Sequence, residues 1–341
     1  MPVFKAGVIG LGNIGFKFNL DTKRKNTWSH VSAYDKCSQA ELAGAVDIDK
    51  KQRDQFGRYF GSVPVFENVS QLFKNLPVDI ISICTPTASH YPVLREVISH
   101  PVKAIFCEKP LASDIHQARE MVRMCKERGI LLAVNHGRRW QSNYLCARQM
   151  ILDKKIGKVK AVTALYPGRI FNIGSHILDA IRMLVPHDAK TVSGISFDPD
   201  NPDPSISGWI EFSENIPCAL VATGKREDLV VEMDIIGDQG RIKLLENGNK
   251  IEYYSFSESN RYSGYRELKP SPFDKPRQND GLVDAVDEIC TALRNKKNKI
   301  QCSGEDGLAA LVLVRAMLES ARRNGQPIKL EKKYALSGIT G

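Results

Sequence analysis

The glycine-rich turn near the N-terminus constrains the fold of this chain more than any other feature. The apolar run from Val3 to Ile9 leads directly into Gly10-Leu11-Gly12-Asn13-Ile14-Gly15. In a strand-turn-helix unit the first glycine permits a tight turn, the second lets the backbone approach a pyrophosphate, and the third lets the helix pack on the strand. The helix N-terminus also offers N–H donors to phosphates. We therefore expect a dinucleotide to be bound by Gly10, Gly12, Asn13, Ile14 and Gly15.

The first third of the chain alternates short β-rich runs with helical spacing, which predicts a parallel sheet covered by helices on both faces. The runs are almost continuously apolar, as such buried strands require. The expected strands are 3–9, 42–46, 80–84, 103–107 and 130–134, and the segments 68–74 and 113–127 have helical spacing. We predict an N-terminal Rossmann domain with a doubly wound parallel sheet over residues 1–136.

Residues 137–341 have a different pattern and predict a C-terminal α/β domain with a large, mostly antiparallel open sheet. A helix expected at 141–152 precedes strand-like alternation at 158–165, 205–212, 218–223, 229–236 and 241–245. The segments 198–204 and 255–278 are predicted as turn-rich or polar connections that could be mobile. Two helices follow, and the second is expected to begin at the cap signal of Ser303 and Asp306 and to end at Asn324-Gly325.

Composition excludes several classes of protein. A chain of 341 residues with 42% hydrophobic and 26% charged residues is typical of two globular domains. No apolar run approaches the ~20 residues of a membrane helix, and no signal peptide is evident, so we expect a cytoplasmic protein without a membrane partner. The eight cysteines have no paired spacing, which favours free thiols and no metal site.

The formal net charge of +9 favours anionic ligands such as a cofactor pyrophosphate, a sugar phosphate or a nucleotide sugar. Solubility alone would also explain this excess. The basic residues are spread along the chain without a nucleic-acid motif, so no nucleic-acid partner is expected.

An acidic residue at the end of the second strand would accept hydrogen bonds from the adenosine ribose and repel a 2′-phosphate. Asp47 has this position and favours NAD, although Lys50, Lys51 and Arg53 could still hold the 2′-phosphate of NADP. More residues separate Asp47 from Gly15 than the usual ~20. The segment 16–29 is the predicted insertion, either a flap over a ligand or a solvated surface loop.

Two later strands end in residues suited to ligand binding, because ligands of parallel sheets bind at the carboxyl edge. One strand ends in Thr85-Pro86, with His90 nearby, and the next ends in Glu108-Lys109-Pro110. The last strand of the domain ends at Asn135. We include Thr85, Pro86, His90, Glu108, Lys109 and Asn135 among the candidate cofactor ligands.

At this point the chain resembles the glucose-fructose oxidoreductase and inositol dehydrogenase family of sugar-type dehydrogenases. The resemblance spans nearly the whole chain, and its most specific element is Glu108-Lys109-Pro110. It also includes the glycine turn, Thr85-Pro86 with His90, Gly174-Ser175-His176 followed by Asp179, and the closing helix from Asp306-Gly307 through Ser320 to Gly325. The family implies a nicotinamide cofactor, a sugar, cyclitol or related small-molecule substrate, and a homo-oligomer, dimeric or tetrameric, often formed through the open sheet.

The resemblance further implies that Lys109 contacts the reacting hydroxyl and that His176 acts in proton transfer. Elementary chemistry agrees, because an imidazole can remove a hydroxyl proton near neutral pH and an ammonium stabilises the developing alkoxide. The family usually has an aspartate four residues before the histidine, whereas this chain has Asn172. An amide can orient the substrate or the imidazole but cannot relay protons, so the mechanism and the direction of reaction stay open.

Three arginines could hold a carboxylate or phosphate of the substrate through bidentate hydrogen bonds, or could instead link the two domains. They are Arg138, Arg139 and Arg169. Two other functions remain open on the same fold: an NAD-dependent, redox-assisted glycosidase or lyase, and a non-catalytic nucleotide-binding sensor, which Asn172 suggests.

Overall fold

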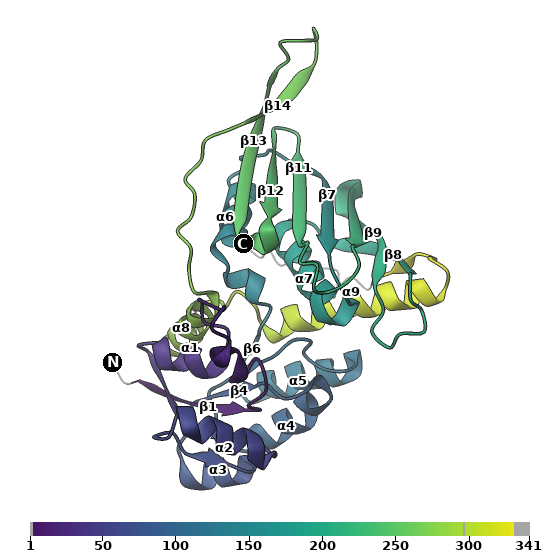
Figure 1. Ribbon diagram of the computed structural model, residues 1–341. Helices are drawn as coiled ribbons and strands as arrows, with labels where there is room; N and C mark the ends of the chain where they lie inside the picture. Colours follow the sequence, from purple (N-terminus) through teal and green to yellow (C-terminus); the bar gives the residue numbers. More distant parts are fainter. Residues whose placement is uncertain (1–2, 296, 331–341) are drawn as a thin grey trace. The chain divides into compact units, whose positions relative to one another are not determined.

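The structure is a computed structural model that describes residues 3–295 and 297–330 (Figure 1). The chain forms two compact units: the first extends to Trp140 and includes Asn279–Leu308, and the second comprises Gln141–Gln278 and the chain from Ala309 onward. We had expected a single division after residue 136. The later segment belongs to the first unit because it is bonded there: Trp140 Nε1 donates to Glu288 over 2.8 Å, and Val134 N donates to the Cys302 carbonyl over 3.1 Å.

The first unit contains the predicted Rossmann sheet. Its six strands have the order β3-β2-β1-β4-β5-β6, and all neighbouring pairs are parallel. The order reverses between β1 and β4, which is the switch point where ligands of such sheets bind. The strands are β1 (Phe4–Ile9), β2 (Ala40–Val46), β3 (Val65–Phe66), β4 (Ile80–Ile83), β5 (Ala104–Cys107) and β6 (Leu131–Val134).

Helices cover both faces of this sheet, as the apolar strands predicted. On β4, Ile81 packs near Gly7 and Leu72 of α3, whereas the next residue, Ser82, bonds Tyr34 of α1, so these helices lie on opposite faces. The helices are α1 (His30–Lys36), α2 (Lys50–Tyr59), α3 (Val69–Asn75), α4 (His90–Val97), α5 (Ile115–Glu127) and α8 (Gly281–Arg294), with short η1 (Lys17–Leu20), η2 (Thr87–Ser89) and η3 (Gly137–Trp140).

The second unit contains the predicted open sheet, with nine strands in the order β14-β13-β12-β11-β7-β10-β9-β8-β15. Among the described strands of this sheet, β7 and β10 pair in parallel and the other neighbours are antiparallel. The strands are β7 (Val159–Tyr166), β8 (Ala189–Ser196), β9 (Ile206–Phe212), β10 (Ile216–Ala222), β11 (Glu232–Gly237), β12 (Gly240–Leu245), β13 (Lys250–Glu258), β14 (Arg266–Pro270) and β15 (Ile328–Lys329).

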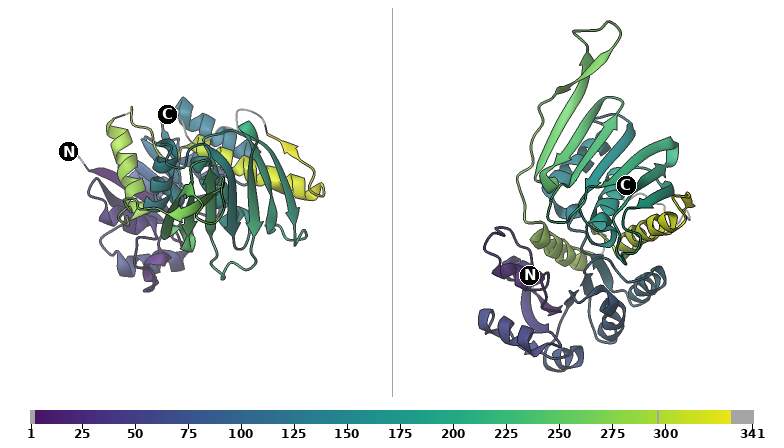
Figure 2. Two further views of the ribbon diagram at one scale, coloured as in Figure 1. Left: turned by 90° about the horizontal axis from the view of Figure 1, so that it is seen from above. Right: turned by 45° about the vertical axis from the view of Figure 1, so that its right-hand side comes forward.

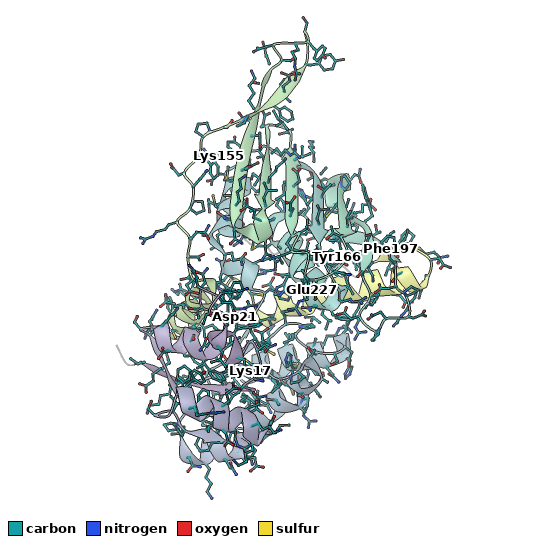
Figure 3. All side chains as sticks on the ribbon, in the orientation of Figure 1. Lys17, Asp21, Lys155, Tyr166, Phe197 and Glu227 are labelled. Atoms are coloured by element: carbon teal, nitrogen blue, oxygen red, sulfur yellow. The ribbon has the colours of Figure 1, made fainter. Side chains whose placement is uncertain are left out.

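Helices cover one face of this sheet and leave the other open (Figure 2). Buried side chains of α6, α7 and α9 form a core with the strands. The opposite face exposes apolar side chains, which are Ile195, Trp209 and Val221, and Phe197 follows β8 (Figure 3). The helices are α6 (Ser142–Leu152), α7 (Ser175–Leu184) and α9 (Gly304–Arg322), with η4 (Ile170–Gly174), η5 (Ser213–Asn215) and η6 (Glu246–Gly248).

One predicted connection contains regular structure instead. Residues 255–278 were expected to be a polar connection, but β13 and β14 form a hairpin in which Ser255 pairs with Lys269 and Phe256 with Leu268. In the part of β13 that pairs with β14, Tyr254–Glu258, and in β14 itself, side chains on both faces are partly or fully exposed, so the alternation that marks a half-buried strand is absent there. All eight cysteines are free thiols, as expected. Within the described residues, no helix has the length and apolar character to cross a membrane.

Candidate functional site

The three glycines of the N-terminal turn have different surroundings. Gly10 has a φ of +94°, and a Cβ there would lie 2.8 Å from the backbone of Cys84 and Thr85. At Gly15 a Cβ would lie 1.9 Å from the Gly10 carbonyl oxygen, whereas a Cβ at Gly12 would meet nothing within 4 Å. The outer glycines are therefore required by backbone geometry and close packing, and the Gly12 backbone is open to a ligand. This arrangement fits a bound pyrophosphate.

The insertion 16–29 directly follows this turn, and its residues Lys17–Leu20 form the short helix η1. Phe18 N donates to the Asn13 carbonyl over 2.9 Å. The chain returns at His30, whose N–H donates to the Ile14 carbonyl over 3.0 Å, and Val31 N donates to the Gly15 carbonyl over 3.1 Å. The start of helix α1 is thus bonded to the glycine turn, and the residues inserted between them explain why Asp47 lies so far along the sequence.

The insertion is held by its own polar and aromatic contacts. Ser29 Oγ donates to Asn19 Oδ1 over 2.7 Å, and the Arg24 guanidinium lies 3.9 Å from the Phe18 ring centroid and 5.2 Å from that of Trp28. Lys17 and Asp21 mark its first part in Figure 3. The loop is therefore built from specific contacts, and a role as a flap over a ligand stays a prediction.

Asp47 follows the end of β2 beside the glycine turn. Its Oδ2 accepts the Leu11 N–H over 2.7 Å, and its Oδ1 accepts the Asp49 N–H over 2.9 Å. Each oxygen retains acceptor capacity for a ribose hydroxyl. The Arg53 guanidinium donates through Nη1 to the carbonyls of Asp47 and Ile48. Asp47 is thus fixed where the fingerprint requires its acidic residue.

His90 joins the ends of two strands. Its imidazole is fully buried, with Nε2 2.9 Å from the Thr85 carbonyl and Nδ1 3.1 Å from that of Pro110. The peptide bond between Lys109 and Pro110 is cis. We had expected His90 to be a cofactor ligand, but its ring nitrogens are engaged by backbone carbonyls. It therefore fixes the Thr85-Pro86 turn against the turn that carries Lys109.

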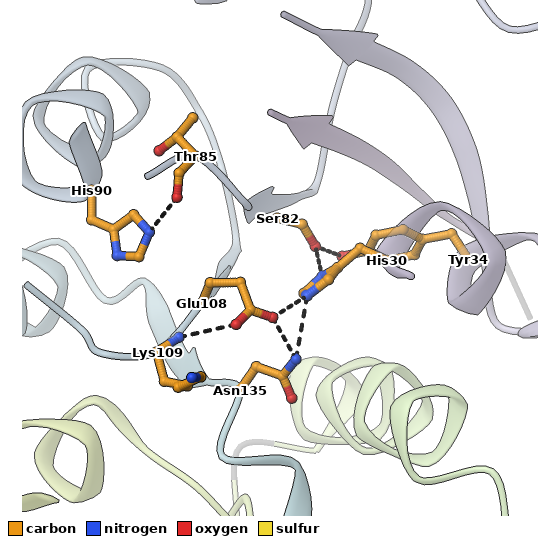
Figure 4. A network of polar contacts seen from close by, with 8 residues as sticks. All are labelled: His30, Tyr34, Ser82, Thr85, His90, Glu108, Lys109 and Asn135. Atoms are coloured by element: carbon orange, nitrogen blue, oxygen red, sulfur yellow. Dashed lines mark hydrogen bonds and ion pairs between the residues drawn. The ribbon is translucent and has the colours of Figure 1, made fainter. Parts of the chain in front are cut away.

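A buried polar network surrounds Glu108 (Figure 4). Its Oε1 lies 3.0 Å from His30 Nε2 and accepts Asn135 Nδ2 over 2.6 Å, and its Oε2 accepts the Lys109 N–H over 3.2 Å. His30 Nδ1 lies 2.8 Å from Ser82 Oγ. Glu108 and Asn135 were expected to bind cofactor, and the structure brings them together beneath Lys109. Sequence reasoning missed His30 and Ser82. For Ser82, the available signal was a hydroxyl inside an apolar strand.

Charge in this network is set by burial and by close partners. Burial alone would raise the pKa of Glu108, but hydrogen bonds from His30 and Asn135 and the charges of His30 and Lys109 hold it below its usual value. Burial raises the pKa of the neighbouring Cys84 and Cys107 thiols, which stay neutral. The network therefore keeps a buried carboxylate directly before Lys109.

The arginines of the first unit have structural partners. Arg139 is 1% exposed. Its Nη1 donates to the Gln301 carbonyl over 2.7 Å, and its Nη2 lies 3.1 Å from Asp306 Oδ1. These contacts tie η3 to the start of α9 within the first unit. Arg138 is also buried. The predicted substrate contact of Arg139 would thus compete with an ion pair already formed.

The candidates of the second unit lie on one continuous turn and helix. Arg169 precedes the π-helix η4, which contains Asn172 and continues into α7, where His176 is the second residue. A single turn of π-helix is frequent at functional sites. Phe171 N donates to Asp203 Oδ1 over 2.8 Å, so the 198–204 connection supports this turn. Arg169 itself forms an ion pair with Asp198 of that connection.

The fold thus gathers the predicted residues into two groups. In the first unit the glycine turn, Asp47, Thr85, Lys109 and Asn135 follow strands of one parallel sheet at its carboxyl edge, where dinucleotides bind. In the second unit Arg169, Asn172 and His176 lie within eight residues of sequence. No group of three or more His, Cys, Asp or Glu side chains in the described part of the chain could hold a metal ion.

These features define the protein as a Rossmann-type oxidoreductase with an NAD-binding domain. Residues 4–136 match the profile of an oxidoreductase family with an NAD-binding Rossmann fold, and residues 167–330 match that family's C-terminal α/β domain. The chain belongs to the GFO/IDH/MocA oxidoreductase family, as its sequence motifs indicated.

Individual relatives are distant but cover almost the whole chain. Inositol 2-dehydrogenase of Rhizobium meliloti is 25% identical, covering 94% of this chain and 97% of the relative. Among solved structures, the WlbA dehydrogenase of Bordetella pertussis with NADH and UDP-GlcNAcA has a TM-score of 0.77 at 18% identity, covering 97% and 99%. A super-repressor mutant of Gal80p from Saccharomyces cerevisiae has a TM-score of 0.80 at 15% identity, covering 98% and 100%. The last two comparisons support the fold alone.

Proposed function

We propose that the protein is an NAD(P)-dependent dehydrogenase that transfers a hydride between nicotinamide and a secondary hydroxyl or keto group of a sugar, a cyclitol or one of their derivatives. The observation that carries this proposal is the position of Lys109. It follows β5 at the same sheet edge as the glycine turn, and its neighbours Glu108 and Pro110 are held by His30, Asn135 and His90.

In this proposal the bound dinucleotide supplies the hydride acceptor, held by the glycine turn and Asp47. The Lys109 ammonium binds the reacting oxygen and stabilises the charge that develops on it. The His176 imidazole takes the hydroxyl proton during oxidation and returns it during reduction. Asn172 can orient the substrate or the imidazole, but its amide cannot accept the proton.

The preferred cofactor in this proposal is NAD. The Asp47 carboxylate, held by Leu11 N and Asp49 N, would repel a 2′-phosphate. The proposed substrate carries an anionic group, as in a nucleotide sugar or a sugar acid. The net charge of +9 favours such a ligand. Arg138 stays a candidate contact, whereas Arg169 would have to exchange its ion pair with Asp198 for the ligand.

The test is a panel of sugars, cyclitols, sugar acids and nucleotide sugars, each incubated with NAD⁺ or NADP⁺ while the absorbance of reduced nicotinamide is followed. We expect reduction with at least one panel member. Lys109→Ala and His176→Ala should each lower kcat by ~10²–10³-fold. The control variant Lys103→Ala removes a lysine that precedes β5 and pairs with Asp79 over 2.8 Å, so it should retain full activity.

Two results would redirect the assignment. Substrate turnover without net nicotinamide reduction would indicate the redox-assisted glycosidase or lyase. Tight binding of NAD(H) with unchanged biological activity in both alanine variants would indicate a sensor, a candidate that Asn172 favours. In either case the simple dehydrogenase proposal fails.

A further inference from the structure

We propose that His30 is a positioning residue that links the glycine turn to Lys109 and keeps the Glu108 carboxylate ionised beside it. This inference deepens the proposed function and rests on it for the role of Lys109. His30 is the residue at which the chain returns from the 16–29 insertion to the helix. No feature of the family resemblance described above assigned it a role.

His30 contacts the glycine turn through its backbone and Glu108 through its side chain. Its backbone N–H donates to the carbonyl of Ile14 in the glycine turn over 3.0 Å. Its Nε2 lies 3.0 Å from Glu108 Oε1, and Glu108 Oε2 accepts the Lys109 N–H over 3.2 Å. Three hydrogen bonds therefore connect the predicted phosphate-binding turn to the backbone of Lys109, and the His30 side chain within this path is fully buried.

The hydrogens of the network can be assigned from its donors and acceptors. An ionised Glu108 accepts only, so His30 Nε2 must carry a hydrogen. With a neutral imidazole, Ser82 donates to Nδ1 and Tyr34 donates to Ser82; with an imidazolium, both of these bonds run in the opposite direction. Tyr34 OH and Ser82 Oγ are 2.8 Å apart, so the neutral assignment gives each hydrogen along this path an acceptor, whereas with an imidazolium the Tyr34 hydrogen needs a further acceptor. Ser82, fully buried, cannot act as a nucleophile toward a substrate.

The groups around Glu108 come from four elements and from Lys109. Helix α1 contributes His30 and Tyr34, and β6 is followed by Asn135. The thiols of Cys84 and Cys107, after β4 and at the end of β5, stay neutral. His30 and Lys109 are thus the charged partners of this carboxylate within the described network. By reciprocity, the carboxylate stabilises the ammonium form of Lys109.

Loss of His30 should therefore change the charge at Glu108. Burial is the largest influence on this carboxyl and raises its pKa, and His30 supplies the main opposing hydrogen bond and charge. Without His30 the carboxyl should become protonated near neutral pH, as buried carboxyls do when their partners are removed. The Lys109 ammonium would then have one negative charge fewer nearby, and more of Lys109 would be present as the free amine.

The test measures the acylation rate of Lys109 by an amine-reactive anhydride, using peptide mass spectrometry of the full-length protein between neutral and alkaline pH. In His30→Leu we expect acylation of Lys109 at neutral pH to be severalfold faster than in the wild type, because a protonated Glu108 no longer favours the ammonium form. The difference should vanish at alkaline pH, where Glu108 ionises again. In Glu108→Gln it should persist until the pH at which Lys109 is fully deprotonated in the wild type as well.

Two matched variants serve as controls. His30→Gln keeps an N–H for Glu108, so its Lys109 should be acylated within about twofold of the wild-type rate. His116→Leu, on the exposed surface of α5, should have the wild-type rate of Lys109 acylation. Thermal unfolding and NADH binding verify that each variant is folded. If His30→Leu does not fold, His30→Asn, which is too short to reach Glu108, replaces it.

A wild-type acylation profile in folded His30→Leu, or in the His30→Asn variant that replaces it, would overturn the inference. A wild-type profile in Glu108→Gln would overturn the electrostatic step. Both readouts need no substrate, so they are independent of the panel that tests the dehydrogenase proposal. Where that panel yields a substrate, the fall of kcat/KM on the acid side of its pH profile should occur at higher pH in His30→Leu than in the wild type. In His30→Gln it should occur at the wild-type pH.

Discussion

Two glycines of the same turn should respond in opposite ways to one added methyl group. In Gly15→Ala the new Cβ would lie 1.9 Å from the Gly10 carbonyl oxygen, whereas ordinary contact begins near 3.4 Å. Backbone must therefore move by about 1.5 Å, which costs ~3 kcal/mol or more because no side chain can rotate away. For a unit of this size we expect Tm to fall by ~6–12 °C.

In Gly12→Ala the added methyl meets no protein atom within 4 Å. Stability should therefore change by less than ~0.5 kcal/mol. The methyl occupies the path by which a pyrophosphate reaches the backbone, so we expect the Kd for NADH to rise at least tenfold, or about 1.4 kcal/mol. Gly57→Ala in α2, where a Cβ also meets nothing within 4 Å, is the control and should leave NADH binding unchanged.

Thermal unfolding followed by circular dichroism gives the Tm of the three variants, and fluorescence titration gives their Kd for NADH. If Gly12→Ala binds NADH as tightly as the wild type, the turn is not the pyrophosphate site. If Gly15→Ala melts at the wild-type temperature, the close-packing explanation of the third glycine is wrong. Equal effects at both positions would show that folding alone, and no ligand, accounts for the motif.

Four further outcomes follow from the same contacts. Asp47→Ala should weaken NADH binding about tenfold and reduce the preference for NADH over NADPH. Titration of the variant with both cofactors tests this. Arg139→Ala removes the partner of Asp306 and should cost ~3–5 kcal/mol in chemical denaturation, with cofactor binding per folded molecule retained. Trp209→Lys should dissociate an oligomer formed through the open sheet face, and light scattering that finds a monomeric wild type would contradict this. The pKa of Glu108 is lowered in the folded state, so its contribution to stability is complete above ~4.3 and is lost as pH falls through the folded value. The melting temperature of Glu108→Gln should therefore fall less steeply than that of the wild type as the pH is lowered.

Much of the first unit could be predicted because its strands are buried on both faces and are nearly pure apolar runs. Their predicted ends differ from the observed ones by at most two residues, as at β2, which begins at Ala40. The two-residue β3 and helix α1 were missed for different reasons. β3 is too short to have a period, and the 16–29 insertion separates α1 from the turn that begins its helix. The hairpin of β13 and β14 was missed because neither face is buried.

Some residues of the candidate site could also be predicted from the sequence, and others could not. Residues that follow a strand, such as Asp47, Thr85 and Lys109, could be found because the carboxyl ends of parallel strands meet at one edge. The partners of His30 could not, since Ser82 is 52 residues away and Glu108 is 78 residues away in sequence. Only packing of α1 on the sheet brings them together, and a single sequence does not reveal which buried polar groups become neighbours.

The place of the insertion explains how the fold tolerates it. The chain leaves the glycine turn and returns with His30 N and Val31 N bonded to the carbonyls of Ile14 and Gly15, so the two ends of the insertion are fixed close together. The entropic cost of closing such a loop rises only slowly with its length. The fold constrains Phe16 and Ser29, which are fully buried, more than the exposed residues between them, such as Lys23 and Lys25. Changes among these exposed residues can therefore alter the loop without disturbing the network that holds Lys109.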